Sequence, residues 1–331
     1  MIQNVFTRRL SALSLAAALG LASTAQATLL WYDGFTLKDV GGDYNVAVVS
    51  PEGTDLGPDL GGQSGGSGTF FTGPWVAAGY PDPVTFQNTK VTATGLTRPG
   101  LISPAVGGST YNTPHFGGCC FESRTSRLMT DPWAGFTNPD GTFYLSFLMN
   151  LGDGNTNDPH HRVFEMHEGG FDDGANRTLQ FGLSSFTGVG NHLALRVKDS
   201  SVSPTTETNA VLSENASLLD LAYQGTHFVV LKFEMSNSGN DVISAFLDPV
   251  GTSEPAASAT VSVGEFLADR MSALVQFTYN GGTSGGLDEI RVGTTFADVA
   301  NNTVEYVPEP ATMSLLGLAA MGAVCVSRRR S

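Results

Sequence analysis

Apolar and polar residues alternate along many short stretches of this chain. Residues 226–235 place Lys232 and Glu234 between apolar neighbours. The apolar positions, which share one side of an extended backbone, are Val229, Leu231, Phe233 and Met235. Successive side chains of a strand point to opposite faces, so this spacing predicts a strand with one buried face. Residues 241–247 follow after a turn-rich connector at 236–240, and the two segments predict a β-hairpin.

The same alternation predicts further strands, at 142–151, 162–167, 179–184, 192–197, 271–279 and 287–292. Helical spacing is nearly absent, and we expect one short helix, at 263–270. Many short strands joined by Gly, Asn and Asp turns favour an all-β domain, an antiparallel β-sandwich or jelly roll.

The region from 41 to 118 is rich in Gly, Pro, Ser and Thr, with a run of Gly and Ser at 61–68. Such a composition is typical of disordered segments. The region also holds four large aromatic residues, which favour loops packed onto the fold: Phe70, Phe71, Trp75 and Tyr80.

Both ends of the chain have features of export signals. Residues 1–27 combine Arg8 and Arg9, an apolar stretch and the small residues Ala25 and Ala27, which predicts a secretory signal peptide cleaved after Ala27. We therefore expect an extracytoplasmic domain at 28–299 and a short linker at 300–306.

The C-terminal segment, residues 307–331, has three parts in a fixed order. Pro308-Glu309-Pro310 holds the backbone extended. The uncharged run at 313–326 would form a helix of about 21 Å, shorter than the roughly 30 Å hydrocarbon core of a bilayer. Arg328, Arg329 and Arg330 resist translocation and are expected to stay in the cytoplasm.

This arrangement resembles the PEP-CTERM sorting signal of Gram-negative bacteria, which an exosortase reads and cuts. A plain tail anchor would explain the helix and the arginines but gives no role to Pro308-Glu309-Pro310. The resemblance implies export, transient insertion of the helix at 313–326 into the inner membrane, and release to the cell surface or extracellular matrix. The partners it implies are an exosortase and the export machinery. It implies no chemical activity.

Charge narrows the range of partners. The chain has 17 basic and 31 acidic residues, a net charge of −14. Without Arg8, Arg9, Glu309 and the three C-terminal arginines, 12 basic and 30 acidic residues remain, a net charge of −18. Such a surface repels phosphate backbones, which excludes nucleic acid as a partner. It suits a soluble secreted protein, and it also attracts divalent cations.

Residues 30–35 and 287–299 are similar to the opening and closing strands of concanavalin-like (LamG-like) domains. In that fold the first and last strands pair. The resemblance allows three functions: glycan or polymer binding, structural adhesion without a small ligand, and polysaccharide cleavage. Concanavalin-like glucanases carry alternating Glu-x-Asp-x-Glu carboxylates, but no Glu here precedes an Asp by two positions, and Asp288 and Glu289 are expected on opposite faces. We assign no catalytic residue.

Two segments carry metal-ligating residue types. Asp153, Asn155 and Asn157 have the spacing of a calcium loop, but Asp158 stands where an EF-hand needs Gly. The segment fits a calcium site at the rim of a sandwich or an Asn/Asp-rich β-turn. Nearby, a strand would place three zinc-ligating types on one face, although the same pattern fits surface histidines beside acidic residues: His161, Glu165 and His167.

Cysteines and tryptophans leave further alternatives. Cys119 and Cys120 are adjacent, and export to an oxidising compartment permits a vicinal disulfide as a rigid loop feature, two free thiols, or pairing between molecules. Tryptophans either stack on sugars or lie in the core, and we expect at least Trp31 in the core. The other two tryptophans are Trp75 and Trp133.

Overall fold

The computed structural model describes part of the chain, and the structural statements below refer to that part. The described residues are 29–45, 48–49, 55–56, 60–80, 89–98, 108–112, 119–130, 141–150, 162–168, 177–184, 192–199, 201, 206–211, 226–279 and 286–300. Among them, no helix is both long and apolar enough to span a membrane.

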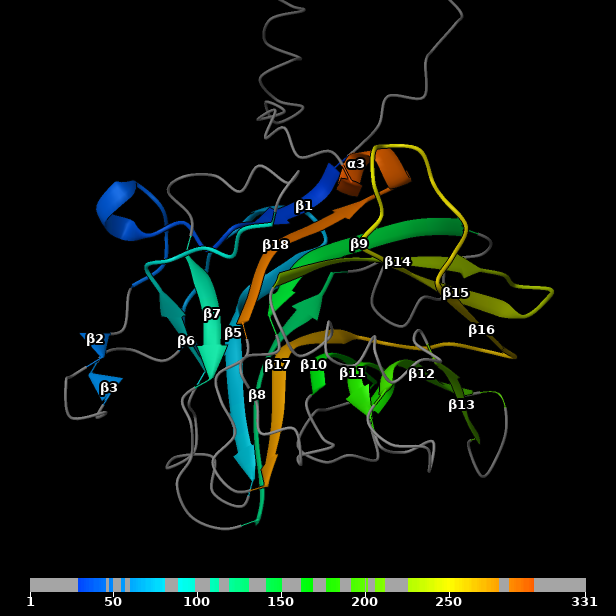
Figure 1. Cartoon of the computed structure of the whole chain (residues 1–331), viewed down its shortest axis with the longest axis horizontal. Helices are drawn as coiled ribbons and strands as arrows, with labels where there is room; N and C mark the ends of the chain where they lie inside the picture. Colours follow the sequence, from blue (N-terminus) through cyan, green and yellow to red (C-terminus); the bar gives the residue numbers. More distant parts are fainter. Residues whose placement is uncertain are drawn as a thin grey trace, which may run out of the picture.

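Two antiparallel sheets pack face to face (Figure 1). The main path of the nine-stranded sheet runs, in spatial order, through β16 (Ala259–Val263), β15 (Asp241–Leu247), β14 (Thr226–Met235), β9 (Gly141–Asn150), β18 (Gly286–Gly293), β1 (Leu29–Asp33) and β4 (Ser67–Gly68). Its remaining strands are β7 (Ser109–Asn112), paired with β18, and β6 (Thr89–Thr92), paired with β7.

The seven-stranded sheet runs through β13 (Thr206–Val211), β12 (His192–Asp199), β11 (Arg177–Ser184), β10 (Arg162–His167), β17 (Arg270–Tyr279), β8 (Cys119–Met129) and β5 (Phe71–Tyr80). Outside the two sheets are the hairpin of β2 (Val48–Val49) and β3 (Asp55–Leu56), the 3-10 helix η1 (Lys38–Val40) and the short helix α3 (Phe296–Ala300).

The sandwich confirms the predicted fold class and the pairing of the first and last strands. In β1 and β18, Leu29 lies opposite Gly293 and Asp33 lies opposite Ile290. The predicted hairpin is β14 and β15, with Phe233 opposite Ile243. The other expected strands are present within one or two residues of their predicted ends. Alternation of apolar residues was therefore a sound guide to this sheet structure.

The helix expected at 263–270 is wrong. β16 ends at Val263, and the residues before β17 form an irregular segment. Its backbone N–H groups are bound by side chains of neighbouring strands: Phe266 N–H donates to Asp241 Oδ2 at 2.7 Å, and Gly264 N–H donates to Asp199 Oδ2 at 2.8 Å. Phe266 and Ala268 both lie in the core. Residues two positions apart would point to widely separated sides of a helix, so the segment stays non-helical.

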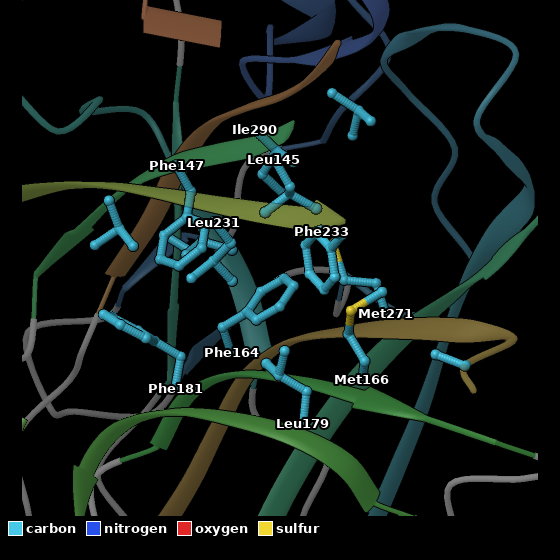
Figure 2. Packing of buried hydrophobic residues seen from close by; sticks show 14 of the residues in the cluster. Leu145, Phe147, Phe164, Met166, Leu179, Phe181, Leu231, Phe233, Met271 and Ile290 are labelled. Carbon is cyan, nitrogen blue, oxygen red and sulfur yellow. The ribbon is translucent and has the colours of Figure 1, made fainter. Parts of the chain in front are cut away.

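The core lies between the sheets and is rich in aromatic rings. The predicted inward face of β14 is buried at Val229, Leu231 and Phe233, and Met235 packs partly buried against it. Figure 2 shows Phe147 of β9 and Phe164 of β10 reaching into this space from opposite sheets. Their ring centroids are 5.1 Å apart. These contacts lock the two layers together.

A second apolar cluster lies on the outer face of the nine-stranded sheet, under α3. Phe296, Val299 and Ala300 of the helix pack there against β9, β14 and β15. The sheet residues beneath them are Tyr144, Leu148, Phe228, Val230 and Phe246. Ser146 Oγ donates to the Val299 carbonyl at 3.0 Å, which secures the end of the helix. The chain thus covers this face with its own last described element.

The Gly-rich segment from 60 to 68 is packed against the fold, as its aromatic neighbours predicted. Its backbone approaches the core closely, since a Cβ atom on Gly65 would lie 2.1 Å from the ring of Tyr44. Gly66 has a φ of +75° and approaches Trp31 in the same way. The glycines therefore serve close packing here rather than disorder.

Candidate functional site

A row of polar residues crosses the outer face of the seven-stranded sheet. Phe164 and Met166 of β10 lie in the core, so Glu165 and His167 point to the opposite face. Strand register places Gln180 of β11 opposite Glu165. Arg196 of β12 lies opposite Gln180 in turn. Three neighbouring strands therefore present polar side chains side by side.

Hydrogen bonds join these side chains. Gln180 Nε2 donates to Glu165 Oε1 at 3.0 Å, and a terminal nitrogen of Arg177 donates to the same oxygen at 3.3 Å. Arg196 donates to Gln180 Oε1 at 3.4 Å. His167 Nε2 lies 3.2 Å from Glu165 Oε2. We call these five residues the polar cluster: Glu165, His167, Arg177, Gln180 and Arg196.

A β-bulge brings Arg177 into the cluster. Met166 lies opposite Leu179, yet the next residue, His167, lies opposite Arg177, so Thr178 is the extra residue of β11. Strict alternation would turn Arg177 towards the core side, because Leu179 is a core residue. The bulge instead turns it towards Glu165, an effect that bulges commonly have near functional sites.

The cluster is deeply placed for charged residues. Glu165 and His167 are 0% exposed, and Gln180 is 9% exposed. Burying charge is costly unless the groups are paired and hydrogen-bonded. Glu165, His167, Arg177 and Arg196 each have interactions beyond those named above, so they are held firmly. A bound molecule would exchange contacts with them rather than fill vacancies.

The outer face becomes aliphatic towards β8 and β5. Glu165 lies opposite Ser272 of β17, which lies opposite Ser126 of β8. Val76 of β5 lies opposite Ser126 and is 44% exposed, and Leu128, two residues along β8, is 40% exposed. One continuous face thus joins a charged centre to an exposed aliphatic end.

The zinc hypothesis is only partly within the described structure. Glu165 and His167 share one face, as predicted, but they are buried, which rules out the alternative of surface histidines for His167. His161 lies outside the described residues. Within the described part of the chain, no group of three or more His, Cys, Asp or Glu residues is arranged to hold a metal.

Other predicted site residues also lie outside the described structure. These are the proposed calcium loop at Asp153, Asn155, Asn157 and Asp158, the signal-peptide residues Ala25 and Ala27, Trp133, and the whole segment 307–331. We expected Cys119 and Cys120 in a loop. Their backbone instead forms the start of strand β8. The state of their sulfur atoms stays a prediction.

Trp31 and Trp75 are buried in the core, which confirms the expectation for Trp31 and excludes surface stacking on sugars for both.

The two tryptophans lie beside a buried polar network. Tyr44 OH donates to Asp33 Oδ2 at 2.5 Å and accepts from Trp75 Nε1 at 3.0 Å. The guanidinium of Arg127 lies 4.5 Å from the ring centroid of Trp31 and 3.6 Å from Asp33 Oδ2. Burial raises the pKa of Asp33 to about 6, against the lowering effect of its hydrogen bonds.

The expectation that Asp288 and Glu289 point to opposite faces is wrong. Leu287 and Ile290 both lie in the core, and the register shifts between Asp288 and Arg291, so a bulge places both carboxylates on the outer face. Glu289 adopts a φ of +53° there.

Both of these carboxylates are held by the surrounding structure. Asp288 accepts from the backbone N–H groups of Leu96 and Glu289, at 2.8 Å and 2.7 Å. Glu289 accepts from Tyr32 OH and from Arg291, each at 3.0 Å. Burial raises the pKa of both acids. These contacts give the pair a structural role at the junction of β1 and β18.

Comparison with known proteins identifies one sequence motif. Residues 307–330 match the PEP-CTERM protein-sorting motif, which confirms the resemblance noted for this segment and indicates exosortase-dependent export with processing at the membrane. No curated protein matches the chain.

Several solved structures are similar to this chain at a low level. Endo-β-1,4-glucuronan lyase from the fungus Trichoderma reesei is 11% identical, with a TM-score of 0.46 over 82% of this chain and 98% of that chain. Domain 4 of the extracellular arabinanase AbnA from Geobacillus stearothermophilus, in complex with arabinotriose, is 13% identical, with a TM-score of 0.36 over 83% and 99%. The botulinum neurotoxin serotype C1 binding domain is 11% identical, with a TM-score of 0.38 over 66% of this chain and 53% of that one. Similarity at this level does not assign an activity or a ligand.

Proposed function

We propose that this protein is exported, cut by an exosortase at its C-terminal motif and released to the cell surface or extracellular matrix, where its β-sandwich binds polysaccharide. The sorting motif at 307–330 supports the processing step. The signal peptide at 1–27 supplies the export step in this proposal. The polysaccharide lies across the outer face of the seven-stranded sheet, over the polar cluster.

The observation that carries the binding proposal is the fixed hydrogen-bond network of the polar cluster. Glu165 holds Gln180 and Arg177, and Gln180 holds Arg196, so donors and acceptors are oriented before a ligand arrives. Binding sites for small molecules and sugars place a few such polar groups beside apolar surface. Leu128 and Val76 supply exposed aliphatic surface on the same face, suited to the C–H faces of sugar rings.

The shape of this face favours a polymer over a single sugar. Neighbouring strands lie about 4.8 Å apart, so a row across the six strands from β12 to β5 extends about 24 Å. The strand register connects this row without a break from Arg196 of β12 through Glu165 to Ser126 and Val76. A saccharide chain running across the strands would meet charged groups first and aliphatic groups further along.

A glycan array tests the binding proposal. The full chain, purified in detergent because of the apolar run at 313–326, is applied with and without calcium, beside Glu165→Gln. We expect binding by the unaltered chain and at least a tenfold weaker affinity for the variant. Binding of no glycan by a folded chain would overturn the proposal and favour a purely structural or adhesive protein. Measuring reducing ends in the same samples tests the remaining alternative, polysaccharide cleavage.

Mass spectrometry of the exported protein tests the sorting proposal. We expect a C-terminus near Pro308-Glu309-Pro310, and replacement of these three residues by alanine leaves the longer form in the inner membrane. An intact C-terminus at Ser331 on surface-exported material would refute the processing step.

A further inference from the structure

We infer that the polysaccharide is anionic and that Arg177 and Arg196 of the polar cluster bind its carboxylate groups. This inference rests on the proposed function, because it names the chemical class of the ligand at the same face. It follows from the charges gathered there and from the way the two guanidinium groups are held.

Cations are concentrated on this face of an otherwise acidic protein. On the outer side of β10, β11, β12 and β17, the described carboxylate is that of Glu165, and Asp269, directly before β17, pairs with Arg270 at 3.2 Å. The cations on the same side are Arg177, Arg196, Lys198 and Arg270. The chain as a whole has a net charge of −14. A local cationic field on an acidic protein attracts anions to that place and repels them elsewhere.

The two arginines present a geometry suited to carboxylates. A guanidinium is planar and matches a carboxylate with two parallel N–H donors, which an ammonium group cannot do. Arg177 and Arg196 lie on the neighbouring strands β11 and β12, and both are oriented through Glu165, directly or through Gln180. Their orientation is therefore set before binding, which reduces the entropy lost when an anion binds.

The bulge in β11 supports this assignment. It turns Arg177, which strict alternation would place on the core side, towards Glu165 on the outer side. Arg177 keeps 17% of its side chain exposed there, so it can reach a ligand as a second guanidinium beside Arg196.

Matched pairs of polysaccharides test the inference on the full chain in detergent. The anionic probes are polygalacturonate, alginate and polyglucuronate, and the first is compared with its fully methyl-esterified form, which keeps the backbone and loses the charge. We expect at least tenfold tighter binding of the acid form at 50 mM NaCl, a difference that shrinks towards 500 mM because salt screens charge.

Variants locate the effect. We expect Arg196→Gln to lose the preference for the acid form. Arg196→Lys should keep only part of that preference, because a lysine retains the charge but lacks the paired N–H donors of a guanidinium. Arg98→Gln is the control, since Arg98 pairs with Asp248 beside the nine-stranded sheet. If a variant does not fold, the inference is still tested by the unaltered chain, through its binding of the acid and ester forms at low and high salt.

Each outcome decides between the two proposals. Equal binding of the acid and ester forms, or binding of neutral glycans alone, overturns the anionic assignment and leaves the proposed function standing. Failure of every polyuronate to bind also overturns the anionic assignment. Failure of every neutral and anionic glycan overturns the proposed function as well.

Discussion

The outer faces of the two sheets differ in polarity. On the nine-stranded sheet, outward positions such as Leu148 and Val230 are apolar, and the helix α3 covers them. On the seven-stranded sheet, the corresponding outward positions are polar, as at Glu165 and Gln180. The apolar outer face beneath α3 is covered by the chain itself, whereas the polar outer face of the seven-stranded sheet is the one at which we propose that polysaccharide binds.

The largest effect is expected where the chain covers itself. Phe296→Ala removes a ring that is 4% exposed and stacks edge-on against Phe246, with centroids 5.4 Å apart. We expect a loss of about 3–5 kcal/mol in the free energy of unfolding. Leu128→Ala on the other outer face should cost less than about 0.5 kcal/mol. Urea unfolding of both variants makes the comparison, and equal losses would contradict it.

A smaller loss is expected from breaking the polar cluster. Glu165→Ala takes the shared acceptor away from Arg177 and Gln180, and we expect a loss of about 2–3 kcal/mol. Glu165→Gln keeps one acceptor oxygen and should lose about half as much. If Glu165→Ala were as stable as the unaltered chain, the cluster would not be the rigid network described here.

The stability of the protein should also depend on pH through one carboxyl of the nine-stranded sheet. The carboxyl of Asp33, on β1, has its pKa raised by burial from 3.8 to about 6. A proton therefore binds the folded state more tightly, so this contribution to stability is fully present below about pH 3.8 and is lost as the pH rises through about 6. We expect Asp33 to add on the order of 2 kcal/mol between pH 7 and pH 4. Asp33→Asn should flatten that part of a melting-temperature profile, and an unchanged profile would contradict the assignment.

Much of the fold was predictable from the sequence, because alternation directly encodes strands that are buried on one face. Leu195 and Val197 around Arg196, for example, show a core side and an outer side. The bulge at Asp288 and Glu289 was not predictable, since nothing in the local sequence distinguishes it from regular alternation. The helix expected at 263–270 is absent because packing between the sheets places both Phe266 and Ala268 in the core, and residues two positions apart cannot share one side of a helix.

The site was predicted only in part. Spacing along β10 pointed to Glu165 and His167, but as zinc ligands. Gln180 and Arg196 were missed because they come from other strands, and register between strands is not written in the spacing of one segment. A usable signal was present, since each is a polar residue between two core residues of its strand.

Hydroxyl-radical footprinting tests the central claim, that the outer face of the seven-stranded sheet binds polysaccharide, most directly. The exposed aliphatic residues Val76 and Leu128 report on that face, and Val250, which is 92% exposed and follows β15, reports on the other sheet. With a saturating polysaccharide, oxidation of Val76 and Leu128 should fall several-fold while oxidation of Val250 stays unchanged. Protection of Val250 alone, or unchanged oxidation of all three residues with ligand bound, would contradict the account.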